Sequence, residues 1–234
     1  MISSRAAIAS AAAWLLLLVF AIALSALAAS HNTLQGDRGL ATWLQDQPFP
    51  GQTLSDGVRA VTQTEVILVL GAVAALVLWV TGYRSQAVIL ALGLVTMGVL
   101  EVGLKGLVDR PRPDPELVER RAGFDSSGSF PSGHVLATTF FYGAVTYFAL
   151  SNRLERMLGW ALIAVSCFFL VTVPLASVWL GVHWPSDILG SWAWAALLLA
   201  LLIAADHAIA VGRVRFPRTF TSNRASWPRD ERHN

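Results

Sequence analysis

Six long apolar segments dominate this sequence and restrict what it can fold into. They run approximately over residues 6–29, 64–80, 86–108, 134–150, 158–177 and 188–211. Each is close to the length of about 20 residues that a helix needs to cross the hydrocarbon of a bilayer. Because the segments are apolar all round rather than alternating, they favour helices over membrane strands. The sequence therefore predicts an all-α integral membrane protein with six transmembrane helices.

The charge content supports this class. Only 14% of the residues are charged, whereas a soluble domain carries about 25%. This low charge excludes an ordinary cytosolic enzyme and a disordered protein. Cys167 is the only cysteine, so an internal disulfide and a cysteine zinc site are excluded as well.

The chain is expected to divide into a six-helix domain over residues 1–212 and a basic, disordered tail over residues 213–234. The first segment resembles a secretory signal, but it exceeds the about 7–15 apolar residues of a signal core, which favours a retained helix. Between the first two apolar segments, two short helical repeats are separated by Pro48 and Pro50. They predict a short helix resting at the membrane interface, in preference to a gate beside a lipid-entry slot.

Arginine and lysine residues between the segments indicate the orientation, because cytoplasmic loops carry more of them. One side of the membrane carries Arg5, Arg84, Arg153, Arg156 and the six tail arginines. The other side carries Arg38, Arg59, Lys105, Arg110, Arg112, Arg120 and Arg121. We therefore expect both termini in the cytoplasm.

Three polar clusters fall on the opposite, extracytoplasmic side in this topology. The first is Lys105-Gly-Leu-Val-Asp-Arg-Pro-Arg112-Pro at the end of the third segment. The second is Pro-Ser132-Gly133-His134 at the start of the fourth. The third is His183-Trp-Pro-Ser-Asp187, between the fifth and the sixth. Clusters at one membrane depth can converge on a single site.

These residue types suit phosphate chemistry. Lys105 and Arg112 place positive charge where a phosphate can sit, and an arginine fork matches phosphate oxygens. Ser132 and Gly133 precede a helix, whose first N–H groups are free to bind an anion.

The two histidines suit the bond-breaking steps. A neutral His183 can attack phosphorus if its other nitrogen is held protonated, and Asp187 is the natural carboxylate for that purpose. His134 can protonate the leaving oxygen. No metal is needed in this scheme, because the cations and the helix terminus supply electrostatic stabilisation.

The three patterns in this order resemble the type-2 phosphatidic-acid phosphatase superfamily, which includes membrane lipid-phosphate phosphatases, glucose-6-phosphatase and vanadium haloperoxidases. The resemblance covers the chain from about residue 6 to residue 211. It implies a bundle of six transmembrane helices. It also implies that Lys105, Arg112, Ser132 and Gly133 bind phosphate, that His134 is the acid, that His183 is the nucleophile and that Asp187 is its partner.

The third motif departs from the family pattern. The family usually has Ser and Arg seven and six residues before the histidine, where this chain has Ala176 and Ser177. Losing one such donor typically costs a factor of about 10²–10³ in rate. Candidate replacement cations are Arg110, Arg120 and Arg121.

The resemblance implies a lipid-phosphate phosphatase of a bacterial-type inner (plasma) membrane, acting through a phosphohistidine, with no cofactor and no nucleic-acid partner. Its partners would be the bilayer and a lipid phosphate such as undecaprenyl diphosphate, phosphatidylglycerophosphate, phosphatidic acid or a lipid A phosphate. Two alternatives stay open. One is a lipid phosphotransferase, and the other is a lipid-phosphate binding or transport protein with weakened catalysis. The sequence does not indicate an oligomeric state.

Overall fold

The computed structural model describes residues 4–123, 127–151 and 155–215, and all the regular structure in these ranges is helical. The helices are α1 (Ser4–Ser30), α2 (Asp37–Gln45), α3 (Gln52–Val61), α4 (Thr64–Val80), α5 (Arg84–Val108), α6 (Gly133–Leu150), α7 (Arg156–Trp179) and α8 (Pro185–Arg215). The predicted all-α class is confirmed. Each predicted apolar segment falls inside one of the long helices α1 and α4 to α8.

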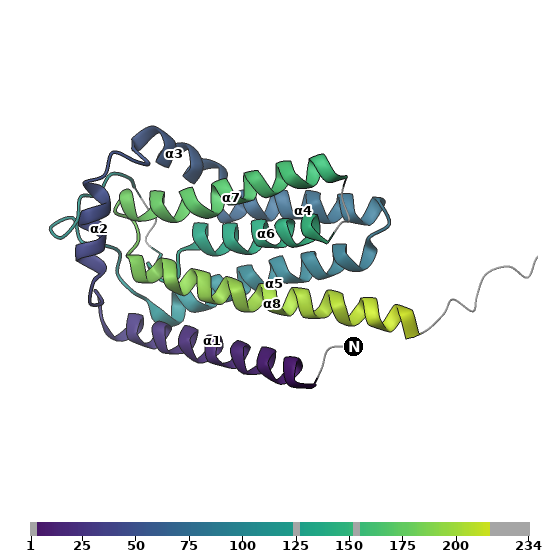
Figure 1. Ribbon diagram of the computed structural model, residues 1–234. Helices are drawn as coiled ribbons and strands as arrows, with labels where there is room; N and C mark the ends of the chain where they lie inside the picture. Colours follow the sequence, from purple (N-terminus) through teal and green to yellow (C-terminus); the bar gives the residue numbers. More distant parts are fainter. Residues whose placement is uncertain (1–3, 124–126, 152–154, 216–234) are drawn as a thin grey trace, which may run out of the picture.

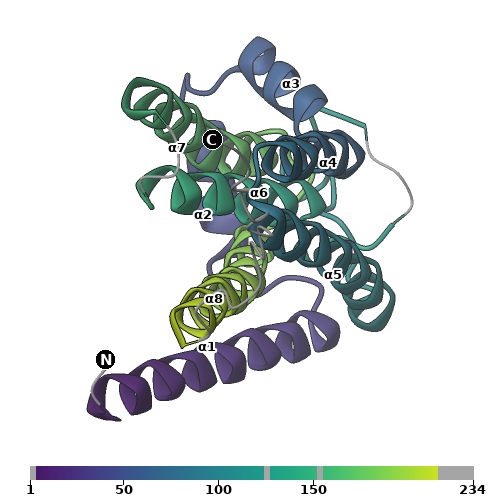
Figure 2. The same cartoon turned by 90° about the vertical axis from the view of Figure 1, so that its right-hand side faces the viewer.

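The long helices form a bundle with α6 at its centre. Helices α4, α5, α7 and α8 run alongside α6, and α1 lies outside them against α8 (Figures 1 and 2). Helix α2 crosses one end of the bundle, and α3 packs on α7 at the same end. The start of α1 and the end of α8 lie at the opposite end (Figure 1). One end of the bundle is thus built from short helices and loops. The other end holds the start of the first helix and the end of the last.

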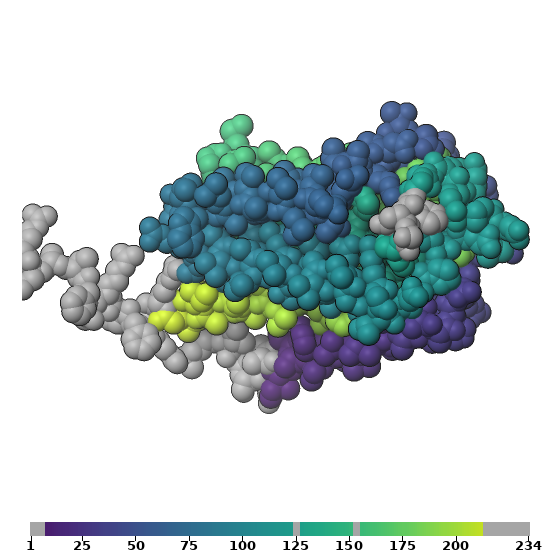
Figure 3. Space-filling model, turned by 180° about the vertical axis from the view of Figure 1, so that it is seen from behind, coloured from purple at the N-terminus to yellow at the C-terminus, as the bar shows by residue number. Residues whose placement is uncertain are grey.

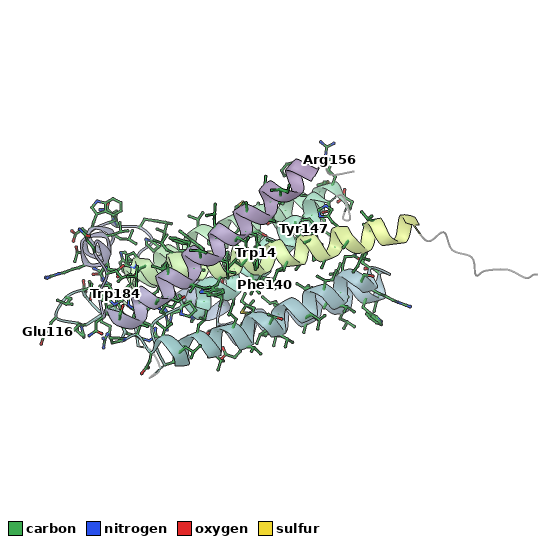
Figure 4. The ribbon with its side chains drawn as sticks, turned by 90° about the horizontal axis from the view of Figure 1, so that it is seen from below. Trp14, Glu116, Phe140, Tyr147, Arg156 and Trp184 are labelled. Carbon is green, nitrogen blue, oxygen red and sulfur yellow. The ribbon has the colours of Figure 1, made fainter. Side chains whose placement is uncertain are left out.

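Helix α6 supplies the centre of the core because its side chains are enclosed on all sides. Leu136, Phe140 and Ala144 are fully buried, and they pack with Leu94 and Met97 of α5. Phe140 lies midway along the bundle in Figure 4. Close helix packing of this kind is common in membranes, where apolar faces meet lipid as readily as they meet each other.

The outer surface is strongly apolar. Leu16 of α1 and Val102 and Leu107 of α5 are 71%, 74% and 82% exposed. Figure 3 shows α4 and α5 side by side over much of one face, with α8 and α1 below them. Such continuous apolar surfaces are unstable in water, and hydrocarbon covers them at no cost.

Length and composition identify four candidate membrane spans among the described residues, namely α1, α5, α7 and α8. Helices α3 and α4, which meet at 52°, form a fifth if they are taken as one bent span. Helix α6 is not among them, since threonine and tyrosine lower its hydropathy. The predicted number of six spans therefore stays a prediction.

Two short helices, where one was predicted, lie on either side of Pro48 and Pro50, because proline interrupts a helix. Helix α2 leaves Leu40 and Trp43 51% and 58% exposed, which suits an interfacial position. Helix α3 instead buries one face against α7, through Val58 among others. It is therefore an integral part of the bundle end rather than a segment resting only on lipid.

The predicted domain boundary at residue 212 falls inside α8, which continues to Arg215. The predicted disordered tail lies, from residue 216 onward, outside the described residues.

Candidate active site

The three sequence motifs meet at the end of the bundle that carries α2 and α3. The end of α5, the start of α6 and the turn between α7 and α8 all lie there. Trp184, which follows His183, is labelled at this end in Figure 4, far from Tyr147 at the other end. Arg112 and His183, which are 71 positions apart in the chain, contact each other here.

His183 lies in the turn between α7 and α8 and is only 3% exposed. Its Nδ1 is 2.8 Å from the main-chain oxygen of Ser129, and its Nε2 is 3.2 Å from Nη1 of Arg112. A carbonyl oxygen only accepts, so Nδ1 carries the proton and donates it to Ser129. Nε2 is then left with a lone pair that faces Arg112.

The environment keeps this ring neutral. Burial lowers the pKa of His183 to about 4, and the charge of Arg112 acts in the same direction. Asp187 opposes both effects. The ring is therefore neutral at neutral pH, with the unprotonated nitrogen that a nucleophile requires.

Asp187 anchors the site from the first turn of α8. Its Oδ2 accepts hydrogen bonds from the Ser129 hydroxyl at 2.5 Å and from the main-chain N–H of Trp184 at 2.8 Å. The same oxygen lies 3.6 Å from Nδ1 of His183. Asp187 thus acts on His183 largely through Ser129, which binds the carboxylate with its side chain and the ring with its carbonyl.

Arg110 holds the other oxygen of Asp187. Its guanidinium is fully buried, with Nη1 2.5 Å from Oδ1 of Asp187 and Nη2 2.7 Å from Oδ2 of Asp37. Ser186 joins the cluster through its hydroxyl, which also contacts Asp37. The positive charge of Arg110 is therefore shared by two carboxylates.

Arg120 and Arg121, the other candidate replacement cations, contact their own loop and its neighbours. Arg120 donates to the carbonyl of Pro113 at 2.7 Å. Arg121 pairs with Glu119 at 2.6 Å, and its guanidinium lies 4.0 Å from the centre of the Trp179 ring.

Lys105 and Gly133 meet at Glu101. The Lys105 ammonium is 2.9 Å from Oε1 of Glu101, which lies one helical turn earlier on α5. The other carboxylate oxygen accepts from the hydroxyl of Thr64 at 3.0 Å. A Cβ atom at Gly133 would clash with the carboxylate of Glu101, so a larger residue there would displace this side chain.

The start of α6 carries two buried polar atoms without a hydrogen-bond partner among the described residues. They are Oγ of Ser132 and Nε2 of His134. The charges of His183 and Lys105 act on the His134 ring, so these side chains lie in the same region of the bundle end. Because buried polar atoms nearly always have a partner, both atoms are candidates to bind a polar ligand.

An apolar groove of about 200 Å³ adjoins this polar site, between α2, α7 and α8. Pro185 and Ile188, beside His183 and Asp187, form one wall, and Leu44 and Val178 contribute to the others. The groove offers hydrocarbon contact a short way from the charged cluster.

Sequence reasoning did not identify Ser129 or Asp37. Ser129 acts partly through its main-chain carbonyl, which no residue pattern reports. Asp37 lies 73 positions before Arg110 and is buried at the start of α2. Burial of the Arg110 guanidinium is the indication that could have pointed to Asp37, because a buried guanidinium needs a carboxylate nearby.

Comparison with known proteins gives consistent results. The family model described as the PAP2 superfamily matches residues 82–209, more than half of the 234-residue chain. Phosphatidylglycerophosphatase B of Bacillus subtilis (strain 168) is 31% identical over 112 residues, 45% of this chain and 51% of that protein. The match thus spans about half the length of that relative.

The fold is also similar to a solved structure. It is the crystal structure of a transmembrane PAP2-type phosphatidylglycerolphosphate phosphatase from Bacillus subtilis. The TM-score is 0.68 at 21% identity, and the superposition covers 84% of this chain and 96% of that chain. At 21% identity, this structural similarity shows a shared fold and nothing further.

Proposed function

Since this chain belongs to the PAP2 superfamily, we propose that it is a membrane lipid-phosphate phosphatase that works through a phosphohistidine. One observation carries the proposal above the others. The Nδ1–H of His183 is held by the Ser129 carbonyl, and this directs a neutral Nε2 at Arg112, a phosphate-binding side chain. Neither a structural histidine nor a binding site needs this arrangement.

In the first step, Nε2 of His183 attacks phosphorus and the bond between phosphorus and the ester oxygen breaks. His134 donates its proton to the departing oxygen, so the lipid leaves as a neutral alcohol or, from a diphosphate, as a monophosphate. The charge of the bound phosphate favours the protonated form of His134. The product on the enzyme is a phosphoryl group joined to Nε2 of His183.

In the second step, a water molecule attacks this phosphorus and the N–P bond breaks. His134, now neutral, accepts a proton from the water, which restores both histidines and releases inorganic phosphate. Arg112, Lys105, the Ser132 hydroxyl and the main chain at Gly133 hold the phosphate oxygens throughout. Because these groups already supply positive charge and N–H donors, we expect a chelator to leave the rate unchanged.

A lipid substrate suits the surroundings of the site. The charged cluster lies at one end of an apolar bundle, and the groove at Leu44, Val178 and Ile188 adjoins it. A headgroup can therefore reach the cations while its chains stay in hydrocarbon. The relative named phosphatidylglycerophosphatase B makes phosphatidylglycerophosphate the first substrate to test, before phosphatidic acid and undecaprenyl diphosphate.

We propose that the site faces the extracytoplasmic side of a bacterial-type inner membrane and that both termini are cytoplasmic. The arginine distribution supports this orientation, and the start of α1 and the end of α8 lie together, away from the site. A protease added outside sealed spheroplasts should leave a C-terminal tag intact. Loss of the tag would reverse the orientation.

The decisive experiment measures phosphate release from the three lipids by the purified full-length protein. The native protein should release phosphate, and His183→Ala should not. His207→Ala is a matched control, because His207 is exposed near the far end of α8. Equal release by the native protein and His183→Ala would remove His183 from the mechanism. An acceptor lipid that becomes phosphorylated would indicate a transferase. Binding of the lipid phosphate without release of phosphate would indicate a binding or transport protein.

A further inference from the structure

The phosphate site has an uncharged residue where its family has an arginine. Ser177 is buried on α7, and its hydroxyl donates to the main-chain oxygen of Val173 at 2.8 Å, inside its own helix. Two nearby cations share their charge with carboxylates, since Lys105 pairs with Glu101, and Arg110 with Asp37 and Asp187. A further source of positive charge would therefore strengthen phosphate binding considerably.

Helix α3 packs on α7 beside this position. Its inner face consists of Ser55, Val58, Arg59 and Thr62, which share one side at helical spacing. Ser55 and Thr62 are completely buried and Val58 is 3% exposed. Arg59, in the same row, is half-buried, so its side chain lies at the edge of this buried face.

The contacts of Val58 show what this face meets. Val58 belongs to a buried cluster with Val135, Trp184 and Ile188. These three residues directly follow His134, His183 and Asp187 in the chain. The inner face of α3 therefore packs into the same apolar cluster as the residues that follow the proposed catalytic ones, although α3 precedes residue 82, where the family match begins.

Arg59 itself is close to His134. Its main chain hydrogen-bonds to the His134 ring, and its charge acts on that ring more strongly than Lys105 does. One guanidinium nitrogen, Nη2, lies 3.3 Å from the main-chain oxygen of Gly123 in the loop that joins the first two motifs. One turn earlier, the buried hydroxyl of Ser55 has no hydrogen-bond partner among the described residues.

We propose that Arg59 is a phosphate-binding residue, and that it supplies from α3 the positive charge that Ser177 does not supply from α7. The inference rests on the proposed function of the site. A guanidinium beside His134 reaches the phosphate oxygens nearest the leaving group, where charge accumulates as the ester bond breaks. Arg59 is thus a better placed replacement cation than Arg110, Arg120 or Arg121.

The test uses the purified full-length protein with Arg59→Gln, which keeps a polar stem but removes the charge, and Arg59→Lys, which keeps the charge. Arg38→Gln is the matched control, because Arg38 is an exposed arginine on α2 at the same end of the bundle. Three quantities are measured for each protein. Calorimetry gives the affinity for inorganic phosphate, and turnover of the preferred lipid gives kcat and KM. The thermal unfolding midpoint is measured without phosphate.

Arg59→Gln should weaken phosphate binding about 10- to 100-fold and lower kcat/KM by about 10²–10³, at an unchanged unfolding midpoint. Arg59→Lys should retain much of both, and Arg38→Gln should match the native protein. Native phosphate binding by Arg59→Gln would overturn the inference. So would equal losses in Arg59→Gln and Arg59→Lys with a lowered midpoint, because the contact with Gly123 would then be structural.

The outcome also separates the inference from the proposed function. If the native protein turns over lipid and Arg59→Gln has no effect, the role proposed for Arg59 is rejected and the phosphatase activity is retained. Weakened phosphate binding in Arg59→Gln, with no lipid turnover by the native protein, would reject the phosphatase and retain Arg59 in an anion site.

Discussion

The guanidinium of Arg110 and the carboxylate of Asp187 form a completely buried ion pair, with Nη1 and Oδ1 2.5 Å apart. The pair joins the end of the first motif to the end of the third, 77 positions later in the chain. Asp37 of α2 binds the same guanidinium, so three separate segments are held at one point. This cluster explains how Arg110, which directly precedes Pro111, contributes to the site without touching the nucleophile.

Replacing Arg110 with methionine should destabilise the protein strongly. Two carboxylates would remain buried without their cation, and breaking a buried pair in this way costs about 3–5 kcal/mol. We expect a large fall in the thermal unfolding midpoint in detergent. Arg38→Met, at an exposed neighbouring position, is the control and should keep the native midpoint. An unchanged midpoint in Arg110→Met would show that the cluster contributes little.

Gly133→Ala should abolish most of the activity, because its methyl group would displace Glu101 and release Lys105 from its partner. Gly98→Ala is a matched control on α5, where an added Cβ meets no atom within 4 Å. It should leave phosphate release unchanged and stabilise its helix by up to about 1 kcal/mol. Full activity in Gly133→Ala would contradict the close contact with Glu101.

The stability of the protein should depend on pH through His183. The pKa of this ring falls from 6.5 to about 4 on folding, mainly through burial. Between these pH values the unfolded chain binds more protons, so stability falls as the pH is lowered through this window. The unfolding midpoint of His183→Gln should change less steeply over the same range. Parallel pH profiles of the two proteins would contradict the low pKa.

Moving the lost charge back to α7 should partly restore the site. The Arg59→Gln, Ser177→Arg double variant is expected to bind inorganic phosphate more tightly than Arg59→Gln alone. The reason is that α3 and α7 pack together beside the same site. Calorimetry on variants with similar unfolding midpoints measures the difference. Equal affinities would show that positions 59 and 177 do not serve one phosphate.

Tyr147→Phe should affect stability but not catalysis. At the far end of the bundle, the Tyr147 hydroxyl and the Gln86 amide each donate to the buried Asp206 carboxylate at 2.7 Å. Removing one donor costs about 1–3 kcal/mol for a buried acceptor. The unfolding midpoint should fall while kcat/KM keeps its native value. A fall in kcat/KM at constant stability would connect this cluster to the reaction.

Much of the fold can be predicted from the sequence because hydropathy is a local property. The segment 64–80 coincides with α4, and the two short repeats around Pro48 and Pro50 correspond to α2 and α3. The pairing of Glu101 with Lys105 is also local, since the two residues are one helical turn apart. Patterns of three or four residues carry this information directly.

The site was predictable only in part. Arg112 and His183 belong to short motifs with a chemical rationale, and the structure brings them to 3.2 Å. Asp187 was expected to contact His183 directly, but its Oδ2 lies closer to the Ser129 hydroxyl. No pattern in the chain reports that the Ser129 carbonyl holds Nδ1, because a main-chain oxygen is the same for every residue.

What the sequence determined by itself is the set of membrane helices and the chemical types of the groups at their ends. Only the tertiary structure decided which of its arginines serve which purpose. Arg110 is buried between two carboxylates, Arg112 faces the nucleophile, and Arg59 approaches His134 from α3. The physical reason is that the role of a charge depends on its distance from other charges and on its burial. Packing between distant segments sets both of these, and the order of residues along the chain does not.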